Sequence, residues 1–386
     1  MKFLKENENT QRYVDSIFSV VNAAKADPLA INATAGCLYD EEGKLFTYDC
    51  VAKADRNISD IERSSYASSP SGNKEYIDLV CDFVLDGKVS ANHTAIAASG
   101  GTGAIYMAVK TCLKDGDTII YPEISWGNYR VIANENNLEV LTYDVYDLED
   151  LFKKIDMTSG KLFLVINSPC ENPLGHAYSM DEWKAIMNKL NGLNREVILL
   201  CDIAYIDYAR NRDYFTLFNE LDDNVLVLLA ASCSKAFSFY GQRLGLLVAI
   251  NNDNEFLDLY FNLCSRLARA TWSNLNNAGM LTIGRVLKED KEAYLKELAE
   301  AREMLMKRSD LFIRQANDCG LELYTFSDGF FVTLKMKDNE SRDKAHQRLL
   351  DNHIYTIKVN KGIRVALCST PLKIVDGLAY KIKELM

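Results

Sequence analysis

The feature that most constrains the fold of this chain is a repeated alternation of short apolar runs with helical stretches. The apolar runs cover residues 94–98, 118–121, 139–143, 162–167, 197–202 and 225–231. Stretches with helical periodicity, such as 103–114 and 179–190, separate many of them. This alternation is typical of βαβ units and predicts an α/β fold, a mostly parallel sheet flanked by helices. Residues 244–250 follow too soon for a helical crossover, so that strand is expected to run antiparallel.

The remaining segments predict a smaller α+β unit beside the sheet. Helices are expected at 11–25, 49–64 and 75–86, and one long charged helix at 283–317 leads to strand candidates at 321–324, 330–335 and 363–367. A length of 386 residues suits about two domains. We expect residues 1–45 to form an N-terminal arm and part of the small domain, 46–295 the large domain, and 296–386 the C-terminal small domain.

Composition excludes several classes of partner. The net charge of −10 argues against nucleic-acid binding and against a basic membrane-binding patch. No apolar run is long enough to cross a membrane, and the N-terminus does not resemble a secretory signal. The ten cysteines form no C-x-x-C pair and are spread evenly. This distribution predicts reduced thiols in a cytoplasmic protein.

The apolar run 225–231 is followed by a segment of polar and cationic side chains. It reads Ser232-Cys233-Ser234-Lys235, and Arg243 follows eight residues after the lysine. A lysine at the end of a buried strand can form a Schiff base, while two hydroxyls and an arginine grip an anion beside it. The alternative is a polar turn with an exposed lysine.

Three more polar segments follow predicted strands, where open α/β sheets bind ligands. Residues 99–103 read Ser-Gly-Gly-Thr-Gly and suit either an anion at a helix N-terminus or a tight strand–helix turn. Trp126 is suited to stacking on a planar ligand or to packing in the core. Asn172, between Pro169 and Pro173, is held in a rigid turn, with ordinary loop chemistry as the alternative.

Asp202 ends another fully apolar run, with Tyr205 close behind it. A carboxylate there is costly unless a cation, such as a protonated ring nitrogen, pairs with it. The alternative is an aspartate that caps a helix. The four histidines are scattered without zinc spacing, so no metal site is predicted, and no Ser-His-Asp arrangement is legible.

Taken in order, these segments resemble the pyridoxal-phosphate-dependent aminotransferases of fold type I, above all the class I aspartate and aromatic aminotransferases. The matching residues are Gly101-Thr102-Gly103-Ala104, Ser125-Trp126-Gly127-Asn128, Asn172-Pro173 with Gly175, Asp202-Ile203-Ala204-Tyr205, Ser232 with Ser234-Lys235, and Arg243 with Gly245. Residues 31–44 and 269–274 also match. The likeness spans roughly residues 12–372.

The resemblance implies roles in binding pyridoxal 5'-phosphate (PLP) for many of the matching residues. Lys235 would hold PLP as a Schiff base and shuttle the proton, and Asp202 would pair with the pyridinium nitrogen. The other implied PLP contacts are Tyr205 and Asn172 at the ring oxygen, Trp126 on the ring, Gly101, Thr102, Ser232, Ser234 and Arg243 at the phosphate, and Tyr66 from a neighbouring subunit.

The same resemblance implies the substrates and a homodimer with a shared active site. Arg364 would bind the substrate α-carboxylate, Gly36 would line the mouth of the site with Trp126 and Asn172, and Arg269 would reach a distal carboxylate across the dimer. The implied reaction is transamination between an acidic L-amino acid, with aromatic ones as further candidates, and a 2-oxo acid such as 2-oxoglutarate.

Some residues depart from the pattern of that subgroup. Gly100 stands where a phosphate-binding serine is common in that subgroup. Tyr129 and Asn167 stand where the aspartate enzymes often have histidines that support the residue corresponding to Asp202. The loop after Tyr66 is one residue off the usual spacing. Because a fold does not fix a reaction, a carbon–sulfur lyase or a decarboxylase stays an alternative, as does a non-catalytic protein that senses PLP.

Overall fold

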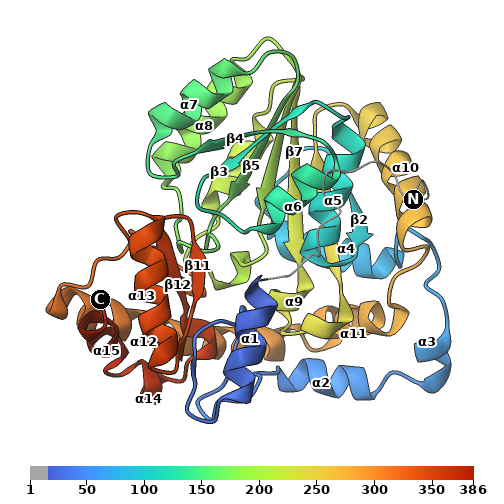
Figure 1. Ribbon diagram of the computed structural model, residues 1–386. Coiled ribbons are helices and arrows are strands. Elements are labelled where there is room, and N and C mark those ends of the chain that lie inside the picture. Colours follow the sequence, from blue (N-terminus) through green and yellow to red (C-terminus); the bar gives the residue numbers. More distant parts are fainter. Residues whose placement is uncertain (1–15) are drawn as a thin grey trace, which may run out of the picture.

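The computed structural model describes residues 16–386, and a seven-stranded sheet is the centre of the part described (Figure 1). Its strands lie in the order β2-β8-β7-β6-β5-β3-β4. They are β2 (His93–Ala98), β3 (Thr118–Pro122), β4 (Glu139–Tyr143), β5 (Leu162–Asn167), β6 (Val197–Asp202), β7 (Val225–Ser232) and β8 (Gly245–Ile250). All neighbours run parallel except β8, which is antiparallel to β2 and β7. The predicted fold class and the antiparallel strand are confirmed.

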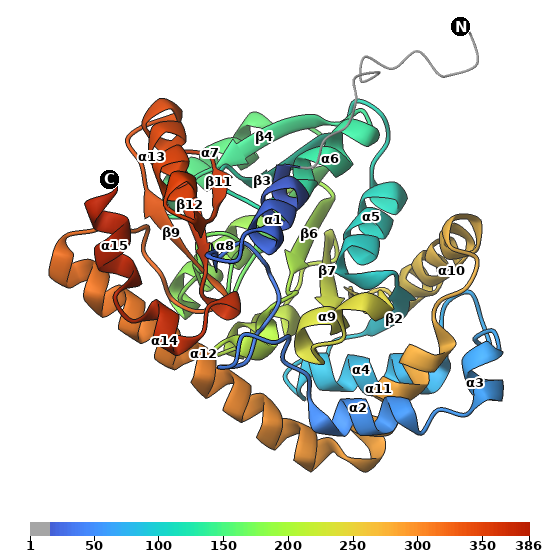
Figure 2. The ribbon, with the colours of Figure 1, turned by 60° about the horizontal axis from the view of Figure 1, so that its bottom comes forward.

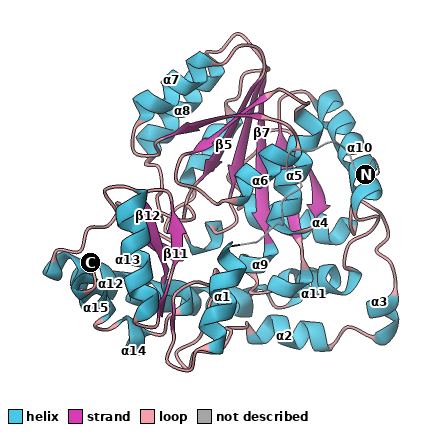
Figure 3. Cartoon of the chain, in the orientation of Figure 1, coloured by secondary structure: helices cyan, strands magenta, loops and turns pink. Residues whose placement is uncertain are grey.

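Helices cover both faces of the sheet because successive strand residues point to opposite sides. Along β6, Ile198 and Leu200 join the apolar core shared with α5 (Gly100–Cys112), α6 (Asn128–Glu135) and α10 (Asn254–Thr271). Leu199 and Cys201 join the opposite core, which is covered by α4 (Lys74–Leu85), α7 (Leu148–Met157), α8 (Met180–Asn191) and α11 (Asn277–Glu289). Figure 3 distinguishes the helices from the strands by colour.

Short helical turns follow two of the central strands and shape the site. After β6 come η1 (Ile206–Tyr208) and η2 (Asp213–Asn219), and after β7 come α9 (Cys233–Ala236) and η3 (Tyr240–Gln242). Because β5, β6 and β7 are parallel, their carboxyl ends lie at one edge of the sheet. The polar segments that follow these strands therefore meet there.

The small unit is a three-stranded antiparallel sheet packed with helices. Its strands lie in the order β11 (Ile357–Val359), β12 (Gly362–Ala366), β9 (Phe331–Lys335). A second pairing joins β1 (Ile31–Asn32) to β10 (Ile354–Tyr355), which brings the N-terminal segment onto this unit. The accompanying helices are α13 (Asn339–Asp351), η4 (Leu367–Ser369), α14 (Leu372–Val375) and α15 (Leu378–Glu384).

One strand prediction in this unit was wrong and others were missed. Residues 321–324 form only an isolated bridge, Leu323 with Leu334. The sequence analysis missed β10 and β11, which are two and three residues long. In the hairpin of β11 and β12 only residues 360–361 separate the strands, and Lys361 takes a left-handed conformation with φ 49°. Two-residue loops of this kind favour glycine and asparagine, so the lysine concealed the turn.

The predicted long helix at 283–317 is two helices. It breaks at Asp290, which ends α11 and precedes α12 (Lys291–Cys319). Its φ of −123° is not helical; its N–H donates to Val286 and its carbonyl accepts from Tyr294. The break lets α11 pack on the sheet domain while α12 runs on into the small unit, as Figure 2 shows. Leu298 in α12 belongs to the large core, and Phe312 to that of the small unit.

The N-terminal helices also differ from the prediction. The structure describes α1 (Ser16–Ala26), and the predicted start at residues 11–15 lies outside the described residues. Residues 49–64 form two helices, α2 (Asp49–Arg56) and α3 (Asp60–Ser64). Ser59 separates them, because its hydroxyl accepts from the N–H of Glu62 while Glu62 accepts from Ser59 in a capping box.

Arg308 on α12 ties the N-terminal segment to the small unit. It is fully buried, pairs with Glu41 at 2.7 Å, and donates to the carbonyls of Tyr39, Leu367 and Cys368. We expect Arg308→Met to lower the free energy of unfolding by about 3 kcal/mol, since it leaves buried acceptors unpaired. Urea denaturation followed by circular dichroism measures this change.

Lys307→Met is the matched control for Arg308→Met. Lys307 is exposed and pairs with Glu303 within the same helix, so its loss should change stability by no more than about 0.5 kcal/mol. Equal urea midpoints for the two variants would show that Arg308 is not a structural tie.

Candidate active site

Lys235 lies one turn beyond the end of β7, on the short helix α9. Its ammonium group is 4.9 Å from the ring centre of Tyr240 and 5.6 Å from that of Tyr205. Burial lowers the pKa of Lys235, and the charge of Arg243 acts in the same direction. An amine with a lowered pKa is neutral in a larger fraction of molecules, so Lys235 is suited to act as a nucleophile or base.

Asp202, at the end of β6, is buried and 5% exposed. The hydroxyl of Tyr129 donates to its Oδ2 at 2.5 Å, and the N–H of Ala204 donates to its Oδ1 at 3.1 Å. Burial raises the pKa of Asp202, and these hydrogen bonds act against burial. The amide of Asn167 donates to the backbone carbonyl of Asp202 at 2.8 Å. Tyr129 and Asn167, the two departures noted above, therefore both hold this aspartate.

The glycine-rich turn and Arg243 form an anion cradle at the N-terminus of α5. Arg243 donates to the Ser234 hydroxyl at 3.3 Å and to the Tyr240 carbonyl at 3.0 Å. Gly100 has φ 71°, and a Cβ there would lie 2.7 Å from Nη2 of Arg243. The left-handed φ of Gly100 favours glycine at this position, since other residues rarely adopt it.

A small inner chamber of about 110 Å³ lies between these groups. Every PLP contact predicted within one chain lines it; Tyr66, which was predicted to contact PLP of a neighbouring subunit, does not. The chamber is lined by Gly101, Thr102, Trp126, Asn172, Asp202, Tyr205, Ser232, Ser234, Lys235 and Arg243, together with Ile105, Asn167 and Ala204. The structure thus brings together ten residues that are dispersed over 143 positions of the sequence, from 101 to 243.

An outer cavity of about 910 Å³ adjoins the chamber and contains Arg364. Arg364 donates to Oδ1 of Asn172 at 3.0 Å and to the Thr34 carbonyl at 2.7 Å, and it lies 4.2 Å over the ring of Phe331. Its Nε–H has no hydrogen-bond partner among the described residues, although it is buried. A buried donor without a protein partner is available to a bound acceptor.

Gly36 lies where the outer cavity meets the chamber. A Cβ at this position would lie 3.3 Å from the Phe331 ring and 3.6 Å from the Tyr205 hydroxyl. Any side chain would therefore narrow the passage between Arg364 and Lys235. The sequence analysis missed Phe331 and Tyr240, because an aromatic residue in an apolar strand or a loop carries no signal of its own.

The loop that carries Asn172 is fastened by buried hydrogen bonds. The N–H of Asn172 donates to Oδ1 of Asn167 at 2.8 Å. Next to it, Glu171 is fully buried and accepts from the N–H of Leu174 at 2.7 Å. Burial raises the pKa of Glu171 well above its ordinary value. Glu171 was not predicted, since an acidic residue in a loop is ordinarily exposed.

Two predicted site residues lie elsewhere. Tyr66 is 88% exposed, and Arg269, also exposed, donates to the Ser273 hydroxyl at 2.6 Å. Neither residue lines the chamber or the outer cavity of its own chain. Asn274 exchanges hydrogen bonds with the backbone of Ala67, so the segments that carry Tyr66 and Arg269 lie side by side.

Residues 16–386 contain neither a grouped metal-ligand set nor a membrane-spanning helix. No group of three or more His, Cys, Asp or Glu side chains in this range is placed to hold a metal ion. Within the same range, no helix is both long and apolar enough to cross a bilayer.

The sequence matches one family profile over most of its length. The profile described as aminotransferase class I and II matches residues 30–382. Among curated proteins, the aspartate aminotransferase of Escherichia coli (strain K12) is 24% identical over 332 residues, which covers 79% of this chain and 82% of that protein.

Solved structures with the same fold cover the whole chain. A crystal structure of an aminotransferase from Anaerococcus prevotii has a TM-score of 0.92 and 29% identity, covering 99% of this chain and 100% of that one. The aromatic-amino-acid aminotransferase from Burkholderia pseudomallei, covalently bound to pyridoxal phosphate, has a TM-score of 0.83 and 20% identity, covering 99% and 100%.

Proposed function

The chain belongs to the class I and II aminotransferases, and from that premise we propose that it exchanges an amino group between acidic or aromatic L-amino acids and a 2-oxo acid such as 2-oxoglutarate. It is an enzyme, a transaminase of a PLP-dependent family, and its substrates are amino acids and 2-oxo acids. The alternatives of a lyase, a decarboxylase or a PLP sensor are not favoured by this membership.

One observation supports transamination of amino acids: an amine, a carboxylate and a guanidinium converge on two adjoining cavities. Lys235 lines both cavities, Asp202 lines the chamber, and Arg364 lines the outer cavity. A screen tests the proposal by mixing PLP-loaded protein with each amino acid in turn and recording the visible spectrum of the cofactor. Acidic and aromatic amino acids should change the spectrum; a response confined to other amino acids would contradict the proposal.

The residues of the chamber fit PLP. The cradle at Gly101 and Thr102 offers N–H groups at a helix N-terminus, and Ser232, Ser234 and Arg243 add donors for a phosphate. We assign the aldehyde carbon of PLP to Lys235, its ring nitrogen to Asp202, its ring oxygen to Tyr205 and Asn172, and its ring face to Trp126. When bound, PLP supplies an electron sink for the charge left on the substrate α-carbon.

Lys235 would remove and return the α-proton at its Nζ atom. An ordinary lysine titrates near ~10.4 and is almost fully protonated at neutral pH. Burial lowers the pKa of Lys235, with a further contribution from Arg243. Because the neutral amine is the base, the rate should rise as the pH rises through the lowered pKa of Lys235. This rise should occur at a lower pH than the titration of an exposed lysine.

Asp202 would keep the ring nitrogen of the cofactor protonated through its negative charge. Its own ionisation is opposed by burial, which raises its pKa, and favoured by the hydrogen bonds from Tyr129 and Ala204. Burial raises the pKa of Tyr129 well above its ordinary value, so Tyr129 stays a neutral donor at any pH of interest. A cationic ring facing Asp202 would offset the cost of burying the carboxylate.

Arg364 would bind the α-carboxylate of the substrate. Its planar guanidinium is held by Asn172 and Thr34 and by the ring of Phe331, which leaves the Nε–H to donate to a ligand. Bidentate geometry suits a carboxylate, and a lysine cannot reproduce it. The interaction orients the α-carbon toward Lys235 and is common to all amino-acid substrates.

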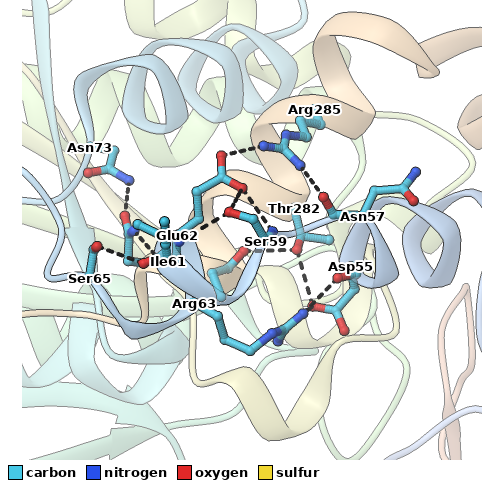
Figure 4. A network of polar contacts seen from close by, with 12 residues as sticks. Asp55, Asn57, Ser59, Ile61, Glu62, Arg63, Ser65, Asn73, Thr282 and Arg285 are labelled. Atoms are coloured by element: carbon cyan, nitrogen blue, oxygen red, sulfur yellow. Dashed lines mark hydrogen bonds and ion pairs between the residues drawn. The ribbon is translucent and has the colours of Figure 1, made fainter.

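We further propose a homodimer in which Tyr66 and Arg269 complete the active site of the second subunit. Both side chains are exposed, and both lie outside the cavity of their own chain. The segment before Tyr66 is held rigidly on α11: Arg285 donates to Glu62 at 2.6 Å and to the Asn57 carbonyl at 3.0 Å (Figure 4). An exposed tyrosine on a fixed segment is suited to a contact with another subunit.

Subunit exchange tests this arrangement. Lys235→Ala should be inactive, and Arg269→Ala should act poorly on acidic amino acids. A mixed dimer then contains one intact site, built from Lys235 of one subunit and Arg269 of the other. When equal amounts of the two variants re-associate at random, half of the dimers are mixed and each has one intact site of two. The mixture should therefore show roughly 25% of the wild-type activity toward aspartate.

The control replaces Arg269→Ala with Arg364→Ala. Arg364 lies in the same cavity as Lys235, so no mixed dimer has an intact site and no recovery is expected. Recovery in both mixtures, or in neither, would contradict the shared site.

The domain boundaries given above stay predictions, and so does a cytoplasmic location. The location is supported by the ten cysteines, all unpaired within the described residues.

A further inference from the structure

The outer cavity concentrates positive charge in an acidic protein. Within residues 16–386, four cationic side chains line it, those of Lys25, Lys235, Arg243 and Arg364, and no aspartate or glutamate of this range does. The whole chain, by contrast, has 54 acidic and 44 basic residues. A cavity with this balance attracts a ligand that carries several negative charges.

Three of the four cations already have a partner under the proposed function, on which this inference rests. Arg243 faces the phosphate of the cofactor, Lys235 its aldehyde carbon, and Arg364 the substrate α-carboxylate. Lys25 has no such partner. Among the residues that the structure describes, the ammonium group of Lys25 has no ion-pair or hydrogen-bond partner, and its exposed side chain lines the cavity.

Lys25 is placed on the face of α1 that forms one wall of the cavity. Ile17, Val21 and Lys25 recur at intervals of four residues and therefore lie along one side of the helix, with Phe18 beside them. Figures 1 and 2 both show α1 between the small unit and the large sheet. This wall thus presents apolar side chains followed, about one turn beyond Val21, by one cation.

The charge of Lys25 reaches into the cavity. Cys37 lies on the segment that contains Gly36 and is itself part of the lining. Burial raises the pKa of Cys37, whereas the ammonium groups of Lys235 and Lys25 both act to lower it. The thiol of Cys37 is thus within electrostatic range of the ammonium groups of Lys235 and Lys25, and both lysines line the outer cavity.

We propose that Lys25 binds the distal carboxylate of acidic substrates from within the same subunit, in addition to Arg269 of the second subunit. The apolar residues of the same helix face, Ile17, Phe18 and Val21, receive an aromatic side chain instead. One wall thereby serves both substrate types, and Lys25 sets the preference for the acidic one.

The test compares Lys25→Met with the wild-type protein, both loaded with PLP. The KM for aspartate should rise about tenfold, the loss expected for one charge-assisted hydrogen bond. The KM for phenylalanine should not change. Inhibition by succinate, a dicarboxylate that does not react, should weaken by the same factor, and Lys25→Arg should restore both values.

Controls separate this inference from the proposed function. Lys53→Met removes an exposed lysine outside the cavity and should change neither KM. In an Arg269→Ala background, Lys25→Met should remove the remaining preference for aspartate. Equal changes for aspartate and phenylalanine, or none for either, would overturn the role of Lys25 while transamination persists. A wild-type protein without transamination would instead overturn the proposed function.

Discussion

Replacing Lys235 with alanine is expected to lower the rate of transamination by about 10⁴-fold or more, since both the covalent anchor and the base are removed. No other group is equipped to act as the base. The pKa of the Tyr205 hydroxyl is raised by burial, so it does not ionise near neutral pH. Asp202 is hydrogen-bonded to Tyr129 and Ala204.

Two measurements accompany the rate. Reduction with borohydride followed by mass spectrometry should find the cofactor on Lys235 in the wild-type protein and on no residue of Lys235→Ala. Added methylamine, a small free base, should restore part of the lost rate. Lys110→Ala, an exposed lysine on α5, is the control and should behave as wild type. Cofactor bound covalently to another lysine would show that the assignment is wrong.

Asp202→Asn is expected to have the second largest effect, a loss of about 10²- to 10³-fold in rate. Asparagine keeps the shape of the side chain and removes only the charge that faces the ring nitrogen. Tyr129→Phe removes one hydrogen bond to the carboxylate, so its loss should be smaller, about tenfold. A rate for Asp202→Asn equal to that of Tyr129→Phe would show that the charge itself is not needed.

A measurement of stability shows whether Asp202→Asn loses activity through its chemistry or because the protein unfolds. Because burial raises the pKa of Asp202 above its unfolded value, ionisation of Asp202 at neutral pH opposes folding of the cofactor-free protein. This cost is absent at a pH below the pKa that Asp202 has in the unfolded chain, and it grows as the pH rises through that pKa. Asp202→Asn should therefore not lower the urea midpoint of the cofactor-free protein at pH 7, whereas a purely structural residue would lower it.

The central sheet could be predicted because its strands are marked by local pattern. Buried parallel strands read as continuous apolar runs, and the polar residues at their ends meet at one edge whatever the details of packing. Lys235 and Asp202 each directly follow or end such a run, so their convergence could be predicted from strand order.

Other parts of the site depend on contacts that no local pattern records. Lys25 and Arg364 are 339 positions apart and line the same cavity because β1 pairs with β10 and β12 lies nearby. The preference for glycine at position 100 follows from its φ of 71°, which is set by the path of the turn from β2 into α5 in the folded chain. The helix break at Asp290 likewise reflects the positions of the two units that α11 and α12 contact.

The most direct test of the account follows the amino group itself. PLP-loaded protein is incubated with 2-oxoglutarate and aspartate labelled with heavy nitrogen, and the products are identified by mass spectrometry. The account predicts glutamate that carries the heavy nitrogen and an equal amount of oxaloacetate, which contains no nitrogen. Both products should be lost in Lys235→Ala. Label released as ammonia, or carbon dioxide formed while 2-oxoglutarate is not consumed, would contradict it.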